Sequence, residues 1–209
     1  MRAKSPETDS IAVFLNIPYD DRFERLYIAY ISGLTHLGLR PRATIEIPGG
    51  RDRLGKILDL IRSCHYSIHD LSRVELDRNA PFATPRFNMP FELGLAVAAT
   101  RIDSLPENWF VFETKHRRVS KSLSDLAGTD VNVHDGTVDG VMRELGNAFV
   151  RQSRNGRYSV PGMMKTYRTV SASVEVILRE TGGRTVFEAG VFRQLCFAAG
   201  RAAEISQSR

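Results

Sequence analysis

A single carboxylate interrupts the apolar stretch PRFNMPFELGLAVAA at residues 85–99, where Glu92 follows Pro90 by two positions. Proline is favoured at the first position of a helix, and glutamate in the first turn complements the helix dipole, so an ordinary structural role is one interpretation. The apolar neighbours argue for another, because a buried charge is costly unless it is paired or faces a wet cleft. We expect the dipole to keep Glu92 ionised, and an ionised carboxylate can attack or stabilise an oxocarbenium-like sugar carbon.

A second carboxylate, Asp70, lies near the end of YSIHDLS at residues 66–72, a stretch that predicts a strand. An acidic residue at a strand end can accept hydrogen bonds from two sugar hydroxyls, as it does in dinucleotide-binding folds. It can equally cap the turn that follows through its own side chain. Both interpretations stay open. His69, beside it in the same strand, is more typical of a structural histidine than of a catalytic base.

Other residue types with known chemistry give weaker signals. Gly49 and Gly50 precede a helix, but the surrounding pattern is not that of a dinucleotide or P-loop motif, so a tight turn is the better interpretation. The histidines and the two cysteines, Cys64 and Cys196, match no metal-binding spacing, and we expect no metal site. Both cysteines lie in apolar helical contexts, which predicts buried free thiols.

The elements that position these residues alternate along the chain. Apolar stretches predict strands at residues 11–16, 40–47, 66–72, 109–114 and 131–134. Helical spacing predicts helices at residues 23–37, 54–61, 90–100, 119–128 and 138–152. Asp21 and Glu24 resemble a capping box for the first helix, and Gly38 is placed to end it. The alternation predicts an α/β fold with an open, doubly wound, five-stranded parallel sheet.

Ligands of such sheets bind outside the carboxyl ends of the strands, where the strand order reverses. The loops at that edge are residues 16–21, 47–52, 70–89 and 114–121. Asp70 and the start of the helix that carries Glu92 both belong to this edge. The sequence therefore predicts that the two carboxylates share one side of the molecule.

The chain divides by composition into four parts. We expect residues 1–9 to be a disordered or loosely ordered polar tail and residues 10–152 to form the α/β domain. Residues 153–162 read as a linker, and residues 163–209 as a C-terminal helical extension with two helices, at 163–179 and 185–207. Small residues in the last helix permit close packing. The extension is interpreted either as a docking or dimerising hairpin or as a cover over the sheet.

Composition bounds the class of protein. The chain has 209 residues, 42% of them hydrophobic, and contains no apolar stretch of membrane-spanning length or secretory signal, so we expect a cytoplasmic protein without a membrane partner. The formal charge of +5 suits a phosphate-bearing ligand, but the 24 acidic residues are mixed among the basic ones. No recognition helix or pattern of alternating aromatic and basic residues favours nucleic acid.

Three motifs together resemble a known family. VFLNIPYDD, YSIHDLS and PRFNMPFELGLAVAA, within residues 11–99, are similar to segments of the nucleoside 2-deoxyribosyltransferases, whose flavodoxin-like layout Toll/interleukin-1 receptor (TIR)-type nicotinamide-nucleotide hydrolases share. The resemblance implies that Glu92 is the nucleophile that displaces the base and that Asp70 binds the sugar. It also places Tyr19 against the sugar or base, and Asn88 beside the sugar, one turn before Glu92.

The chain departs from the family at positions that bear on the substrate. Asn16 stands after the first strand where the family has a small residue, and we include it among the candidate binding residues. The loop at residues 73–89 is long and basic, and Arg73, Arg78 and Arg86 there are candidates for contact with a phosphate, or else solvated loop arginines. This favours a nucleotide over a nucleoside.

These observations predict an enzyme that cleaves or transfers an N-glycosidic bond of a nucleoside or nucleotide. No cofactor is required, and NAD is a possible substrate. The alternative is a non-enzymatic, nucleotide-sensing or self-assembling TIR-like signalling module on the same fold, because fold does not determine function. In either case we expect a homo-oligomer.

Overall fold

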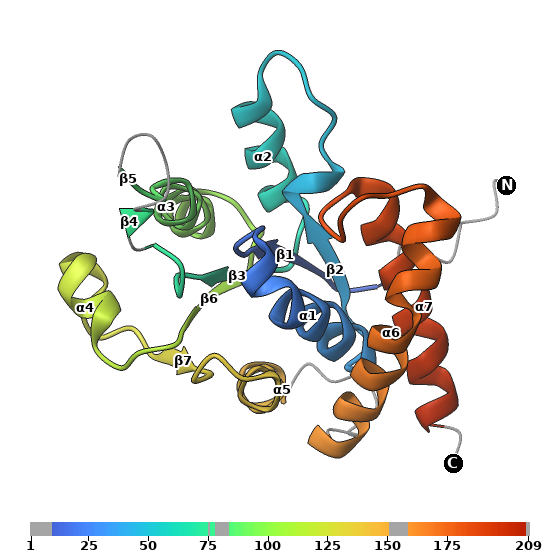
Figure 1. Cartoon of the computed structure of the whole chain (residues 1–209). Helices are drawn as coiled ribbons and strands as arrows, with labels where there is room; N and C mark the ends of the chain where they lie inside the picture. Colours follow the sequence, from blue (N-terminus) through green and yellow to red (C-terminus); the bar gives the residue numbers. More distant parts are fainter. Residues whose placement is uncertain (1–9, 75, 78–83, 151–158, 208–209) are drawn as a thin grey trace, which may run out of the picture.

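The computed structural model describes residues 10–74, 76–77, 84–150 and 159–207 (Figure 1). Its centre is a five-stranded sheet with the order β2-β1-β3-β6-β7, in which every neighbouring pair is parallel. The strands are β1 (Ala12–Asn16), β2 (Arg40–Ala43), β3 (Tyr66–Asp70), β6 (Asn108–Glu113) and β7 (Val131–Val133). This confirms the predicted α/β class and gives the strand order of flavodoxin-like folds.

The strand order reverses beside β1. From β1 the chain first crosses to β2 on one side and then returns to β3 on the other. A crevice is expected outside the carboxyl ends of β1 and β3, where the connections diverge. A separate antiparallel pair, β4 (Leu76–Asp77) and β5 (Thr84–Pro85), lies in the long connection that follows β3.

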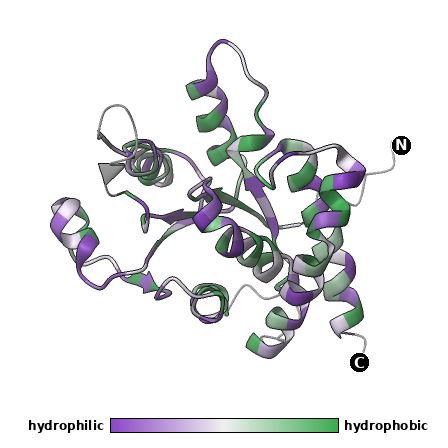
Figure 2. Cartoon of the chain, in the orientation of Figure 1, coloured by the Kyte–Doolittle hydropathy of each residue, from purple (hydrophilic) through white to green (hydrophobic). Residues whose placement is uncertain are grey.

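Helices cover both faces of the sheet. They are α1 (Glu24–His36), α2 (Arg53–Arg62), α3 (Asn88–Ile102), α4 (Arg118–Ser122), α5 (Val138–Phe149), α6 (Val160–Thr181) and α7 (Ala189–Gln207). In β1, Val13 and Leu15 belong to the core shared with α1 and α5, and Phe14 belongs to the core shared with α2 and α3. A strand buried on both faces needs apolar residues at successive positions, which explains the unbroken apolar stretch in this part of the sequence. The α2 helix shows the contrasting pattern of an element with one buried side, and in Figure 2 its ribbon alternates between hydrophobic and hydrophilic colours.

The first helix is shorter at its start than predicted. Residues Asp21–Phe23 form a 3-10 turn without a side-chain cap, and α1 begins at Glu24, so the predicted capping box is wrong. The side chain of the preceding Asp20 pairs with an arginine instead. The predicted end is confirmed, because Gly38 has a φ of +79° and the next amide, of Leu39, donates to the carbonyl of Leu34 at 2.9 Å.

Two other boundaries differ for local reasons. The predicted strand at residues 40–47 ends at Ala43, because Glu46 Oε1 accepts a hydrogen bond from the Ala43 amide at 2.8 Å and folds residues Thr44–Glu46 into a 3-10 turn. The predicted helix at residues 119–128 is divided into α4 and a third 3-10 turn, Ser124–Leu126. The predicted inward positions of α5 are confirmed, since Val141, Leu145 and Phe149 are fully buried.

The α3 helix differs most from its prediction. It begins at Asn88, two residues before Pro90, and it is not buried all round. Its inner side packs through Leu93, Ala96 and Ala99, but the side chain of Phe91 is 55% exposed. A helix made almost wholly of apolar residues has no polar face to mark its outer side, so the sequence pattern alone did not distinguish the two sides.

The predicted C-terminal helices form an outer layer against α1. Met163, Val170 and Leu195 are buried in the same core as α1. At the end of α1, His36 Nδ1 lies 2.9 Å from Thr166 Oγ1, and the Gln207 amide donates to the carbonyl of His36 at 2.9 Å. The extension therefore covers α1, as Figure 1 shows. The predicted N-terminal tail and most of the predicted linker lie outside the described residues.

None of the helices in the described part of the chain combines the length and the hydropathy that a membrane span requires. Cys64 is buried and Cys196 is half-buried, and both are free thiols. The predicted buried free thiol is confirmed for Cys64, whereas for Cys196 the predicted burial is not reached.

Candidate functional site

Glu92 lies in the second turn of α3 rather than in its first. Its side chain is 8% exposed, and among the described residues no hydrogen-bond partner reaches Oε2. Burial raises the pKa of the carboxyl from 4.5 to about 7, and the positive charge of Arg53 opposes this only in part. Burial thus works against the expectation that the helix dipole keeps Glu92 ionised, because loss of water outweighs a dipole that acts mainly on the first turn.

Asn16 ties the end of β1 to the first turn of α3. Its amide nitrogen donates to the carbonyl of Met89 at 2.8 Å and lies 2.9 Å from Nδ1 of His69. Since the amide donates, Nδ1 accepts and the imidazole proton sits on Nε2, which faces Ser67 Oγ at 3.1 Å. Asn16, predicted to bind substrate, is itself buried, and its amide holds α3 one turn before Glu92.

His69 is a neutral structural residue, as its sequence context predicts. It is fully buried, and burial lowers the pKa of its imidazole to about 3. An imidazole in that state takes up no proton near neutral pH and serves only to orient Asn16.

Asp70 is fully buried and all of its contacts are internal. Oδ1 accepts from the Ser72 amide at 2.9 Å, which is the turn cap considered above, and Oδ2 accepts from the Tyr30 hydroxyl at 2.7 Å. His134 Nε2 lies 3.1 Å from the same oxygen, and its Nδ1 accepts from the Gly136 amide at 3.2 Å, which leaves the proton of the neutral ring on Nε2.

Burial by itself opposes ionisation of Asp70, but these partners overcome it. His134 and Ser72 together lower the pKa of Asp70 below its usual range. The carboxylate joins α1, β3 and the loop that precedes α5 at the carboxyl edge of the sheet. In this arrangement both oxygens are occupied by the protein, so Asp70 has the geometry of a positioning residue.

Tyr19 lies between the end of β1 and the C-terminal extension. Its hydroxyl is 3.3 Å from Thr44 Oγ1, and its ring packs against those of Tyr27 and Phe187. Burial raises the pKa of the phenol above its usual range, and the negative charge of Glu92 raises it further.

Arg53 is a site residue that the sequence analysis missed. It begins α2, and its two terminal nitrogens each lie 3.4 Å from a backbone carbonyl, those of Thr44 and Ile47. The residue is exposed, and its charge lowers the pKa of Glu92. The sequence could have indicated Arg53, because it lies one residue beyond the loop at 47–52, and that loop belongs to the edge of the sheet where ligands bind in such folds.

The arginines predicted to contact a phosphate differ in what the structure shows of them. Asp20 Oδ2 pairs with Arg86 Nη1 at 2.7 Å and with Arg73 Nε at 3.4 Å, so both guanidinium groups already hold a carboxylate. Arg78 lies outside the described residues. Asn88 is exposed at the first position of α3, one turn before Glu92. Asn16 and Asp70 therefore hold the backbone at the carboxyl edge of the sheet, the charge of Arg53 lowers the pKa of Glu92, and the charge of Glu92 raises that of Tyr19.

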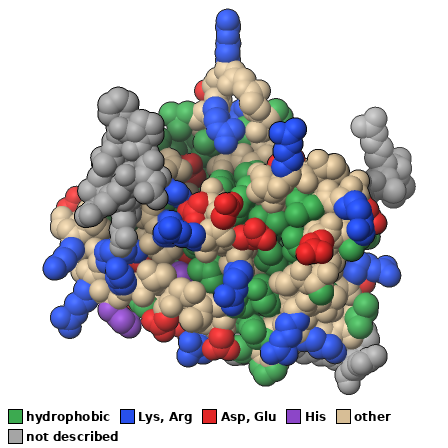
Figure 3. Space-filling model, viewed as in Figure 1, with side chains coloured by type: hydrophobic (Ala, Val, Ile, Leu, Met, Phe, Trp, Pro, Cys, Tyr) green, Lys and Arg blue, Asp and Glu red, His purple; other side chains and the backbone are tan. Residues whose placement is uncertain are grey.

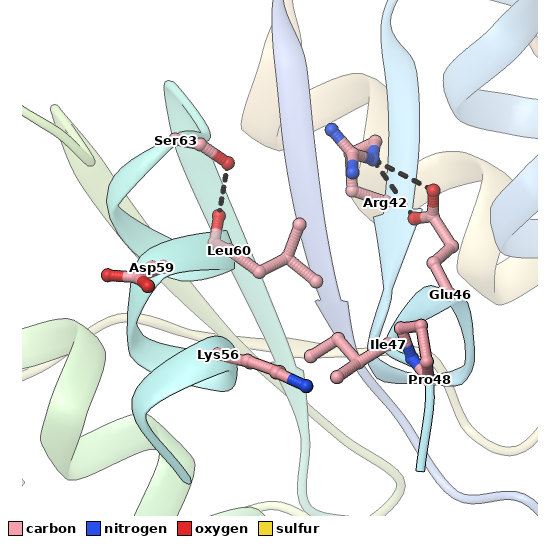
Figure 4. A pocket seen from close by; sticks show the side chains of 8 residues that line it. All are labelled: Arg42, Glu46, Ile47, Pro48, Lys56, Asp59, Leu60 and Ser63. Atoms are coloured by element: carbon pink, nitrogen blue, oxygen red, sulfur yellow. Dashed lines mark hydrogen bonds and ion pairs between the residues drawn. The ribbon is translucent and has the colours of Figure 1, made fainter. Parts of the chain in front are cut away.

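A hollow of about 330 Å³ lies elsewhere, between β2 and α2 (Figure 4). It is lined by Arg42, Glu46, Ile47, Pro48, Lys56, Asp59, Leu60 and Ser63. It contains none of the predicted site residues, and the ion pair between Arg42 and Glu46 occupies one of its walls. Within the residues that the structure describes, no group of three acidic, histidine or cysteine side chains is arranged to hold a metal ion. On the face drawn in Figure 3, Lys and Arg side chains are interspersed with acidic ones.

Comparison with known proteins adds no family assignment: no protein-family model, curated protein or solved structure matches the chain.

Proposed function

We propose that this protein cleaves or transfers the N-glycosidic bond of a nucleotide-type ligand, with the Glu92 carboxylate as the nucleophile. The observation that supports this most is the state of Glu92, which is buried with Oε2 unpartnered beside the strand-order reversal. A buried carboxylate without a partner is costly to fold, and reactive centres are where proteins retain such groups.

In the proposed reaction the carboxylate forms a bond to the anomeric carbon of the sugar while the bond to the base breaks. The bonding electrons leave with the base, and water or a second base then displaces the carboxylate. Tyr19 packs against the sugar or base. Arg53 is exposed, its charge lowers the pKa of Glu92, and its guanidinium is suited to a phosphate, which favours a nucleotide over a nucleoside. Asp70 and Asn16 hold the surrounding backbone.

The proposal is tested by incubating the protein with a panel of nucleosides, nucleotides, NAD and NADP and separating any released base by chromatography. Glu92→Gln keeps the size of the side chain and removes the nucleophile, so base release should be lost. Glu175→Gln, on the exposed side of α6, is the matched control and should keep full activity. Absence of base release by the wild type from every ligand would refute the function, and activity in Glu92→Gln would refute the nucleophile.

The pH dependence gives a second test. The nucleophile must be ionised, and the pKa of Glu92 is about 7. The rate should therefore rise through neutral pH and level off above about pH 8. A rate that is constant between pH 5 and 8 would indicate that a different group attacks.

One observation favours the alternative, a self-assembling module. The outer side of α3 exposes three large apolar side chains, with Phe87 67%, Phe91 55% and Ile102 81% exposed. At 3.6 residues per turn these positions fall within about 60° of one another on the helix. A phenylalanine side chain has about 200 Å² of surface, so at these exposures Phe87 and Phe91 together leave more than 200 Å² of apolar area in water. This is a quarter or more of the area that one partner buries in a standard interface.

The occupant that this surface suits best is a second copy of the chain. Two α3 helices packed antiparallel would set the phenylalanines of each copy against Ile102 of the other, as two-fold symmetry requires. Light scattering across a concentration series should then show a dimer that Phe91→Glu dissociates. A wild type that remains monomeric at all concentrations excludes this module in its self-assembling form.

A further inference from the structure

The hollow between β2 and α2 has the features of a second binding site. Its volume of about 330 Å³ falls at the lower end of the range of small-molecule sites in proteins. One wall comes from Arg42 of β2 and the turn that follows this strand, and the other from Lys56, Leu60 and Ser63 of α2 and its C-terminal end (Figure 4). Glu92 is not among the lining residues, so a role for the hollow does not depend on the function proposed above.

Lys56 places a positive charge at one end of the hollow. In Figure 4 its side chain extends from α2 toward Ile47 on the opposite wall. In the part of the chain that the structure describes, no hydrogen bond or ion pair engages Lys56. The carboxylate of Asp59, on the same helix, points away from β2 in this view. The Lys56 ammonium group is therefore available to pair with an anion from outside the chain.

Arg42 supplies unused hydrogen-bond donors from the opposite wall. Its Nε donates to both carboxylate oxygens of Glu46 at 3.0 Å, and the Ala43 amide donates to Glu46 Oε1 at 2.8 Å. The charge of Glu46 is thus balanced within the protein. The terminal nitrogens of Arg42 have no hydrogen-bond partner among the described residues. Their N–H groups remain for a ligand, since a guanidinium donates from all three of its nitrogens.

Apolar side chains separate these two cationic groups. Leu60 lies between Lys56 and Arg42 in Figure 4, and Ile47 lies on the opposite wall. Lys56 and Leu60 are four positions apart and share one face of α2, and Ser63 lies about a turn further along. At a rise of 1.5 Å per residue, the helix covers about 10 Å from Lys56 to Ser63. Over this length the hollow has a cation at one end, apolar walls in its middle and hydrogen-bond donors at the other end.

We propose that this hollow binds an elongated organic acid. The carboxylate of the ligand pairs with the Lys56 ammonium group, and its apolar body packs against Leu60 and Ile47. A hydrogen-bond acceptor at the far end of the ligand meets the terminal nitrogens of Arg42. The carboxylate on the β2 wall, that of Glu46, is already paired, so the charges of the hollow favour an acid over an amine.

Three naphthalene derivatives separate the features of this ligand. The acid 6-hydroxy-2-naphthoate has the carboxylate, the apolar body and the far acceptor; 2-naphthoate lacks the acceptor, and 6-hydroxy-2-naphthamide lacks the charge. Each is titrated into isotope-labelled protein while the backbone amide signals are followed by NMR. The hydroxy acid should bind most tightly and should shift the amides of residues 42–48 and 56–63. Its amide counterpart should bind about fivefold more weakly, the effect of one exposed ion pair.

A matched pair of variants tests the charge on the protein side. Lys56→Met keeps much of the length of the side chain and removes the ammonium group, so both acids should bind about fivefold more weakly and the amide compound equally well. Lys165→Met, at an exposed position of α6, changes the net charge by the same amount and should leave all three affinities unchanged.

Four results would overturn the proposal. Equal binding of the hydroxy acid and its amide would show that the hollow does not recognise the charge. Equal effects of Lys56→Met and Lys165→Met would show a general attraction to a basic protein. Shifts confined to α3, where Phe87 and Phe91 are exposed, would show apolar adsorption at another surface. Absence of saturation at about 5 mM probe, where a millimolar Kd is already apparent, would show that no site exists.

Discussion

Replacement of Glu92 by glutamine should make the protein more stable at alkaline pH and leave its stability nearly unchanged at acidic pH. The pKa of this carboxyl is raised from 4.5 to about 7 in the folded state. The folded state thus binds the proton more tightly than the unfolded chain, and the resulting stabilisation is complete below pH 4.5 and is lost as the pH rises through 7. At about 1.4 kcal/mol for each pH unit, the loss is about 3 kcal/mol.

Glutamine stays uncharged throughout this range, so it does not carry the penalty. Its free energy of unfolding should exceed that of the wild type by about 3 kcal/mol above pH 8, and the two should agree within about 1 kcal/mol at pH 4.5. For a chain of this size the alkaline difference corresponds to a melting temperature about 6–12 °C higher. Thermal unfolding followed by circular dichroism at four or five pH values measures the difference directly.

The change of this difference with pH is the decisive quantity, since any effect of the amide on packing is independent of pH. Glu175→Gln, at an exposed position of α6, is the control and should show no such change. A difference between wild type and Glu92→Gln that stays constant from pH 4.5 to 8.5 would refute the burial of an unpartnered carboxylate. So would a wild type that is the more stable of the two at pH 8.

Two further predictions concern the residues that support the site. Acid should destabilise the protein, because burial lowers the pKa of the His69 imidazole to about 3. The contribution of the neutral imidazole to stability is complete above pH 6.5 and is lost as the pH falls toward 3. Denaturant titrations at pH 4 and 7 measure this loss, and His69→Gln should make the free energy of unfolding depend less on pH. Asp70→Asn should lower the free energy of unfolding at pH 7 by about 3 kcal/mol or more, because it gives the Tyr30 hydroxyl a weaker acceptor and removes the negative charge 3.1 Å from His134 Nε2. Equal stability of the two proteins would contradict the internal role of Asp70.

The sheet could be predicted because its signals are local. Apolar residues at successive positions of β1 and β3 indicate strands buried on both faces, and the glycine that ends α1 has the positive φ that its position requires. The outer side of α3 could not be predicted in this way. Its exposed and buried residues have the same apolar character, and only packing against the sheet and Val119 of α4 distinguishes Leu93 from Phe91.

The candidate site depends on contacts that join distant parts of the chain. Asn16 reaches the carbonyl of Met89, 73 residues away, and Tyr30 reaches Asp70, 40 residues away. No local spacing encodes such pairs. For this reason the sequence identified Asn16 and Asp70 as polar groups at the right edge of the sheet but could not tell whether they face a ligand or the interior. Arg53 was missed for the same reason, since its relation to Glu92 exists only in the folded chain.

The carboxylates near this edge of the sheet differ in one respect that bears on function. Both oxygens of Asp70 accept hydrogen bonds, those of Glu113 accept them from Arg118 and the amide of Thr114, and Asp20 pairs with Arg86. Oε2 of Glu92 has no such partner among the described residues; Oδ1 of Asp20 has none either, but Oδ2 of Asp20 holds an arginine. Removal of a paired carboxylate should therefore destabilise the protein, whereas removal of Glu92 should stabilise it above neutral pH. A side chain whose loss improves folding is retained for a reason other than folding, and this opposition between stability and activity is the property expected of a reactive group.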